Sequence, residues 1–105
     1  MKPVRLEPEA KQELAAAGAW YEERREGLGL ELVAEVDAVF AAIARSPSRF
    51  PFYPRVAPEL AVRRAGARHF PYSIALVELA TVVRVLAVAH EMRRPGYWVG
   101  RLDGL

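Results

Sequence analysis

The residues best suited to chemistry gather directly after the most apolar run of the chain, Val82 to Ala89. They are His90, Glu91, Arg93, Arg94, Tyr97 and Trp98. An imidazole and a phenol exchange protons, and guanidinium groups hold a phosphate or a carboxylate at two points. These residue types would suit metal-independent acid/base work on RNA, for which His90, Arg93 and Tyr97 are the catalytic candidates.

Each of these side chains also has a structural interpretation. His90 could simply be a polar residue at a strand end, and the aromatic pair Tyr97 and Trp98 could pack against the sheet. Arg84 lies inside the apolar run, so its charge needs a partner or an edge. We expect Arg84 to be paired structurally rather than to act on a substrate.

Other kinds of catalytic site are poorly supported. The chain has no Cys, and its only histidines are His69 and His90, which makes a weak case for a metal site. It has no HExxH, P-loop or GxGxxG motif, and its serines show no nucleophile elbow. We therefore expect neither a metal nor a cofactor.

Length and composition narrow the class of protein. The 105 residues, of which 52% are hydrophobic, predict one compact domain spanning residues 1–105. Charged residues interrupt the N-terminus, so no signal peptide is expected, and no apolar run reaches the ~20 residues of a membrane span. Together with the absence of Cys, this predicts a cytoplasmic protein with no membrane partner.

The small net charge of +2 hides an asymmetry along the chain. Residues 1–44 carry a net charge of −4, whereas residues 45–105 carry +6, and every basic residue of the second part is Arg. An Arg-rich half suggests an acidic protein segment or a nucleic acid as the partner. The alternative is a solvated, charged sheet face.

Two helices are predicted in the first half. Glu7-Pro8-Glu9 favours a helix start, and apolar residues at helical spacing continue from Leu14 to Tyr21, so we expect a helix to about Glu26. Gly27-Leu28-Gly29 breaks it, and a second helix is predicted from Leu30 to about Arg45. Such a short connection requires an antiparallel helical hairpin.

Strands account for most of the remaining chain. Residues 2–6 predict a short first strand, and 60–64, 69–77 and 82–89 predict three more, with Pro71 marking an edge or a bulge. The proline-rich stretch 46–58 reads as an ordered loop pinned by Phe50, Phe52 and Tyr53. The predicted class is α+β, in the order β-α-α-β-β-β. The helical hairpin, through its Leu14–Tyr21 and Leu32–Ile43 stripes, should pack on a mostly antiparallel four-stranded sheet against Val83, Val85 and Ala87 or their opposite-parity neighbours.

Several segments, in this order, resemble the RelE/ParE toxin superfamily. They are Trp20-Tyr21, Gly27-Leu28-Gly29, Glu35-Val36, residues 47–51, Phe70-Pro71-Tyr72, and the ending AVAH…RRPGYW at 87–98. The resemblance covers nearly the whole chain, and the ending is its most specific part. It implies a type II toxin neutralised by an antitoxin whose C-terminal segment wraps it. It also leaves open a homodimer or a toxin–antitoxin hetero-oligomer.

The superfamily divides by target, and the residues here favour one branch. RelE-like members cut mRNA in the ribosomal A site with lysines, arginines and a C-terminal Tyr, a position that Tyr97 resembles. The only lysines of this chain, Lys2 and Lys11, lie before or within the first helix, and Glu91 would repel a phosphate. The RRPGYW ending is more similar to the ParE-like, plasmid-stabilisation branch, whose members poison DNA gyrase.

Our leading interpretation is therefore a growth-inhibiting toxin that binds a target such as gyrase. The alternatives are a ribosome-dependent mRNA endoribonuclease and a non-toxic domain that binds an antitoxin. The residues expected to contact the target are Arg64, Arg68, His90, Arg93, Arg94, Tyr97 and Trp98.

Overall fold

The computed structural model describes residues 1–105 as two helices and a four-stranded sheet. In chain order the elements are β1 (Val4–Leu6), α1 (Pro8–Arg24), α2 (Leu28–Arg45), β2 (Arg63–Gly66), β3 (Tyr72–Glu78) and β4 (Val83–His90). Short 3-10 turns occupy Pro47–Arg49 and Pro58–Leu60, and a longer one, Val99–Gly104, ends the chain. This is the predicted α+β class and element order.

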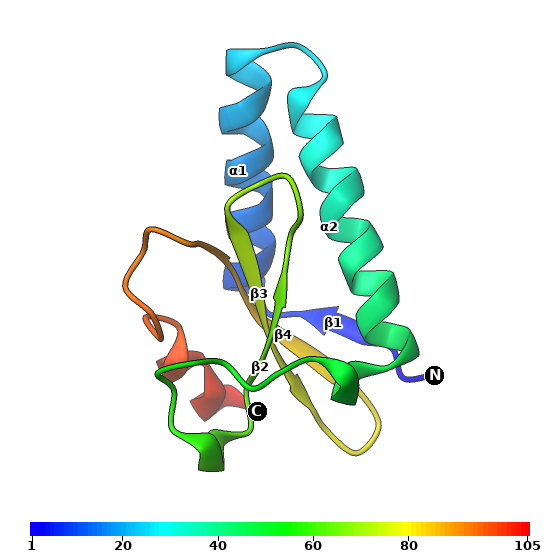
Figure 1. Ribbon diagram of the computed structural model, residues 1–105, viewed down its shortest axis with the longest axis vertical. Helices are drawn as coiled ribbons and strands as arrows, with labels where there is room; N and C mark the ends of the chain where they lie inside the picture. Colours follow the sequence, from blue (N-terminus) through cyan, green and yellow to red (C-terminus); the bar gives the residue numbers. More distant parts are fainter.

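The sheet has the strand order β1-β4-β3-β2. Strand β1 runs parallel to β4, while β3 is antiparallel to both β4 and β2. Figure 1 shows the two helices running side by side and joined by a tight turn at the end far from the C-terminus. Strand β4 is therefore central, and its end at His90 carries the chain toward the predicted functional residues.

The turn between the helices depends on Gly27 and Glu22. Gly27 has a φ of 87°, in the left-handed region that glycine tolerates best. The Glu22 carboxylate accepts hydrogen bonds from the backbone N–H groups of Gly27 and Gly29, at 2.8 and 2.9 Å. These bonds satisfy free donors at the start of α2 and hold the pKa of Glu22 below its usual value, although burial opposes that shift. Helix α2 thus begins at Leu28, whereas the sequence predicted a break at residues 27–29 and a helix start at Leu30.

The helices approach each other closely at Gly29, and Gly29 and Gly18 offer a matched pair of test substitutions. A methyl group at Gly29 would lie 2.4 Å from the backbone oxygen of Gly18, so Gly29→Ala should lower the free energy of unfolding by about 1–3 kcal/mol. A methyl group at Gly18 would make an ordinary 3.6 Å contact with Val33, so Gly18→Ala should be neutral or stabilising by about 0.5–1 kcal/mol. Urea denaturation of both variants checks this. Equal effects at the two positions would contradict the close approach.

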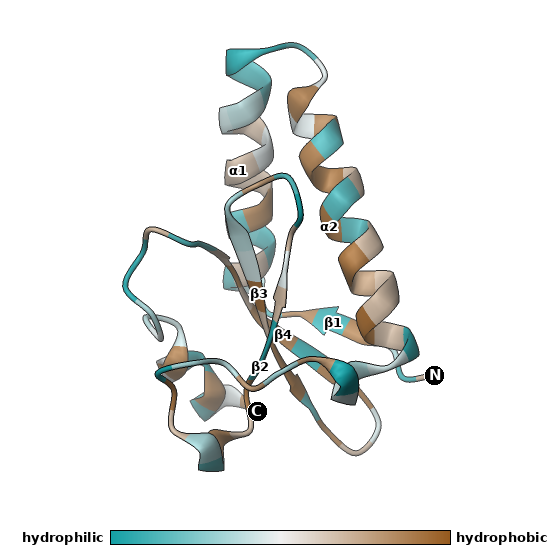
Figure 2. Cartoon of the chain, in the orientation of Figure 1, coloured by the Kyte–Doolittle hydropathy of each residue, from teal (hydrophilic) through white to brown (hydrophobic).

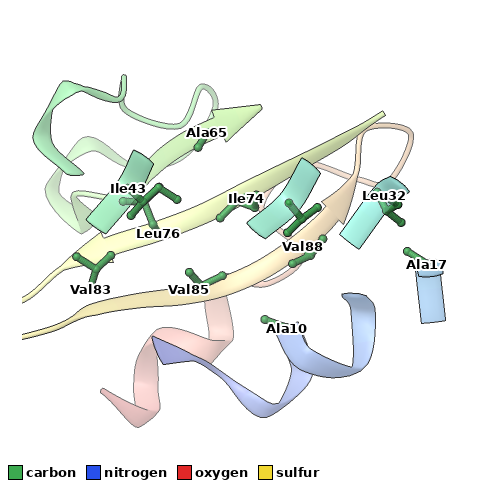
Figure 3. Close-up of a cluster of buried hydrophobic side chains, with 11 residues drawn as sticks. Ala10, Ala17, Leu32, Ile43, Ala65, Ile74, Leu76, Val83, Val85 and Val88 are labelled. Atoms are coloured by element: carbon green, nitrogen blue, oxygen red, sulfur yellow. The ribbon is translucent and has the colours of Figure 1, made fainter. Parts of the chain in front are cut away.

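The main core lies between the helical hairpin and one face of the sheet. Figure 3 shows its side chains converging from both helices and from β2, β3 and β4. Leu32, Val36 and Ile43 of α2 are fully buried, and Figure 2 shows the hydrophobic residues of α2 recurring along its length. From α1, Ala17 is buried, while Leu14 and Tyr21 are half-buried against this core. Both predicted apolar stripes therefore face the sheet.

A β-bulge in β4 divides the strand between two cores. Ala75 pairs with Ala87, but the next residue of β3, Leu76, pairs with Val85, so Leu86 has no partner across the ladder. Val83 and Val85 consequently face the helices, whereas Leu86 and Ala87 join a second cluster. The prediction that Ala87 shares a face with Val83 and Val85 was wrong for this reason.

The second cluster covers the opposite face of the sheet. Its buried members are Val62, Ala75, Val77, Leu86, Ala87, Ala89 and Trp98. The loop before β2 and the C-terminal 3-10 turn pack over it through Tyr53, Val56 and Leu102. Both faces of β3 and β4 are therefore covered, which explains why the β4 sequence is apolar at both parities.

Several local expectations need correction. Strand β2 begins at Arg63 rather than 60, because residues 58–60 form a 3-10 turn and Ala61 has a φ of 55°. Strand β3 begins at Tyr72 rather than 69, so Pro71 precedes a central strand instead of lying on an edge. Phe52 does not pin its loop, since it is 53% exposed and stacks under the Arg63 guanidinium.

Arg84 has the structural partner expected for a charge in an apolar strand. Its guanidinium donates a hydrogen bond to the carboxylate of Glu7, which lies where β1 passes into α1. The backbone N–H of Glu7 in turn donates to the carbonyl of Val85 at 2.9 Å. This ion pair helps to fix the short β1 strand beside β4.

Candidate functional site

The end of β4 opens into a cleft of about 400 Å³, which we call the strand-end cleft. Its lining residues are Tyr53, Pro54, Arg55, Arg64, Ser73, Ala89, His90, Glu91, Arg93, Arg94, Pro95, Tyr97 and Trp98. Pro95-Gly96 ends the turn after β4, and Gly96 adopts a φ of 79°, which reverses the chain toward Tyr97. The cleft thus forms where a rigid strand, a tight turn and the proline-rich loop meet.

Six of the seven predicted target-binding residues line this cleft. They are Arg64, His90, Arg93, Arg94, Tyr97 and Trp98. Arg68 is not among them, because it is exposed in the turn between β2 and β3. In that turn the neighbouring His69 bonds to Glu35 of α2, at 2.6 Å from its ring and 2.9 Å from its backbone N–H. Arg68 therefore lies in a segment tied to α2 and outside the cleft.

Trp98 forms a wall of the cleft from within the core. It is only 1% exposed, and its ring meets Tyr53 edge-on with centroids 4.9 Å apart. A side chain buried to this degree has almost no surface to offer a partner. The structural interpretation of Trp98 therefore fits its position better than a direct contact with a target.

Glu13 of α1 organises the other wall, and the sequence reasoning missed it. Both terminal guanidinium nitrogens of Arg101 donate to its carboxylate at 3.0 Å, and the Tyr97 hydroxyl donates at 2.5 Å. The backbone N–H of Val88 donates to the same group at 3.0 Å. Glu13 lies three residues after buried Ala10 and four before buried Ala17, so an acid on that apolar face was the signal available in the sequence.

These bonds set the protonation of Tyr97. Burial and the hydrogen bond to Glu13 raise the pKa of Tyr97 well above its ordinary value of 10. The same carboxylate raises the pKa of Arg101, chiefly through its hydrogen bonds. The phenol consequently stays protonated and engaged at neutral pH, which suits it poorly to act as a general base.

The polar contacts inside the cleft favour anion binding. Four arginines line it (Arg55, Arg64, Arg93 and Arg94) against a single acid, Glu91. Glu91 pairs with Arg64 at 3.1 Å and accepts a longer bond, 3.4 Å, from the Ser73 hydroxyl. Arg55 and Arg94 have no ion-pair partner within the chain, so their forks remain available for a carboxylate or phosphate.

His90 lies at the junction of the cleft with the helices. Its Nδ1 accepts a hydrogen bond from the backbone N–H of Met92 at 3.0 Å, and its ring meets Tyr72 edge-on at 5.1 Å. An Nδ1 that accepts leaves the proton of the neutral ring on Nε2. Across the chain, no three His, Cys, Asp or Glu side chains group as metal ligands.

Comparison with known protein families and with curated proteins finds no match for this sequence. Among solved structures, the chain is similar to one from the chromosomal ParDE TA system from P. aeruginosa. The two chains share 15% sequence identity with a TM-score of 0.74, and the match covers 86% of this chain and 96% of the other. The fold is therefore ParE-like. No helix is both long and apolar enough to cross a membrane.

Proposed function

We propose that this chain is the toxin of a type II toxin–antitoxin pair, is neutralised by a cognate antitoxin, and acts by binding a target protein such as DNA gyrase. The observation that carries the proposal is the fold, which matches a chain of a ParDE system over most of both lengths. The resemblance of the RRPGYW ending to the ParE-like branch supports the same choice.

The strand-end cleft supports binding over cleavage. A metal-independent ribonuclease needs a base for the 2′-hydroxyl and an acid for the leaving oxygen. The Tyr97 hydroxyl is bonded to Glu13, so it is not free to serve as that base or acid. The free arginine forks, by contrast, match carboxylates displayed by a protein surface.

Expression in bacteria tests the proposal. We expect growth inhibition on induction of the wild-type chain and relief when its cognate antitoxin is co-expressed. Filamentation with a DNA-damage response would indicate gyrase, whereas a rapid halt of translation would indicate mRNA cleavage. Normal growth of induced cells, with stable complex formation between the two proteins, would indicate a non-toxic antitoxin-binding domain.

The role of the cleft has its own test. Arg93→Ala combined with Arg94→Ala should abolish growth inhibition with little change in melting temperature. Both side chains are exposed, and such substitutions change stability by only about 0.5 kcal/mol. The control is Arg5→Ala with Arg45→Ala, which removes the same charge from exposed positions outside the cleft and should leave toxicity intact. A folded Arg93/Arg94 variant that remains fully toxic would show that the cleft is not the active surface.

A further inference from the structure

A second depression, which we call the aromatic groove, continues from the strand-end cleft along α1. It measures about 330 Å³ and shares His90, Arg93 and Tyr97 with the cleft. Its floor is formed by small and apolar side chains, among them Ala16, Ala17 and Val88. At its far end stands Trp20, which is 51% exposed although tryptophan is usually well buried.

An arginine lies over an aromatic ring at each end of this groove. The Arg24 guanidinium carbon sits 3.5 Å from the Trp20 ring centroid, and that of Arg93 sits 3.7 Å from the Tyr97 centroid. Stacking on a ring holds a guanidinium in place while leaving its N–H edge free to bind. Within the chain each arginine makes only a long ion pair, Arg24 with Glu23 at 3.6 Å and Arg93 with Glu13, which also lines the groove, at 3.9 Å. Arg24 also donates through Nη1 to the Trp20 carbonyl at 3.1 Å, which leaves its Nε and Nη2 groups for a partner.

The stacking geometry favours a protein over a nucleic acid. Binding of single-stranded nucleic acid relies on aromatic faces that are open to stack on bases. Here a guanidinium already covers a face of the Trp20 ring and of the Tyr97 ring, and Trp20 and Tyr21 meet edge-on with centroids 4.9 Å apart. What remains for a partner is the unbonded N–H groups of the two guanidiniums, which recognise carboxylates.

The two arginines are separated by a distance set by α1. Arg24 lies over Trp20, and Arg93 lies over Tyr97, whose hydroxyl is bonded to Glu13. Glu13 and Trp20 are seven residues apart on α1, which corresponds to an axial rise of about 10 Å. An extended peptide spans the same distance in about three residues. The apolar floor between the arginines offers a place for one hydrophobic side chain.

We propose that the aromatic groove is the docking surface for an acidic segment of the antitoxin, which places one carboxylate on Arg24, a second on Arg93 and an apolar side chain between them. The negative charge of the segment complements the guanidinium groups of Arg24 and Arg93. The identity of the partner rests on the proposed function, whereas the surface and its chemistry rest on the groove itself.

Fluorescence anisotropy with purified protein and a defined probe tests the surface. The probe is a fluorescein-labelled peptide of Glu-Leu-Ala repeats, about 12 residues long, measured beside the same peptide with Gln in place of Glu. At low ionic strength the Glu peptide should bind more tightly than the Gln peptide by about tenfold. Trp20→Ala and Arg24→Gln should each weaken Glu-peptide binding by about tenfold, as for interface residues that carry much of the binding energy.

Matched controls lie outside the groove. Leu30→Ala removes another exposed hydrophobic residue, from the outer face of the helical hairpin, and Arg25→Gln removes the neighbouring charge, which pairs with Glu31. Both should bind like the wild type. Equal binding of the two peptides, or a loss in the Leu30 variant but not in the Trp20 variant, would overturn the proposal.

A nucleic-acid arm and the growth assay separate the remaining outcomes. A fluorescein-labelled oligo-dT that binds more tightly than the Glu peptide, with the same dependence on Trp20, would replace the protein partner with a nucleic acid. Toxicity in cells is scored independently. A non-toxic chain that still binds the Glu peptide through Trp20 would contradict the proposed function but support the docking role of the aromatic groove. A toxic chain that does not bind the Glu peptide would support the proposed function and contradict the docking role.

Discussion

Replacing Trp98 by alanine is expected to lower the free energy of unfolding by about 3–5 kcal/mol, the usual cost of truncating a buried aromatic side chain. Trp98 is 1% exposed and is the largest fully buried side chain of the chain. Its loss would leave a cavity between the sheet and the loop that carries Tyr53, and that wall of the strand-end cleft would lose support.

Thermal denaturation followed by circular dichroism measures this effect. The control is Trp20→Ala, which removes the other tryptophan from a position that is 51% exposed and should cost far less stability. Similar melting temperatures for the two variants would show that Trp98 is not a core residue. A domain of this size loses roughly 4–8 °C per kcal/mol, so the difference between the variants should be easy to resolve.

Glu13→Ala should be the second severe substitution, with a loss of about 3 kcal/mol. Removing one partner of a shielded ion pair is costly because the charge left behind keeps its desolvation penalty. The carboxylate of Glu13 is 15% exposed and bonds Arg101, Tyr97 and the Val88 N–H, all of which would lose a partner. Urea denaturation measures the change.

A double-mutant cycle isolates the contribution of the ion pair itself. Glu13→Ala, Arg101→Ala and the combined variant should show a coupling energy of about 1–3 kcal/mol. Glu26→Ala is the control, because this exposed acid after α1 makes no ion pair. Strictly additive effects at Glu13 and Arg101 would mean that their contact contributes no stability.

The fold could be predicted because its main signals are local. The spacing of Leu32, Val36 and Ile43 indicates which face of α2 is buried, and the β4 run indicates a strand covered on both faces. The bulge at Leu86 gave no local signal, since it depends on how β3 and β4 pair across the ladder. The late start of β2 likewise follows from a turn at Pro58 that propensity alone did not define.

The site was predicted less completely, for a physical reason. The predicted residues cluster in sequence after β4, and a rigid strand end brings neighbours along the chain into one cleft. Glu13 and Arg101 lie 88 residues apart, so only the packing of α1 on β4 and the return of the C-terminal turn bring them together. Arg68 was included for its charge, but the turn that contains it is held against α2 instead.

The Glu13–Arg101 pair also bears on how the protein behaves at high concentration. Beyond Val85, β1 no longer runs beside β4, so the strand has a free edge there. Arg101 donates to the Leu86 carbonyl at 2.8 Å, and Glu13 accepts from the Val88 N–H, so side chains take the places of a missing neighbouring strand. Charged side chains at a sheet edge oppose pairing with a strand of another molecule. The same two residues that support the cleft therefore protect the sheet against edge-to-edge aggregation.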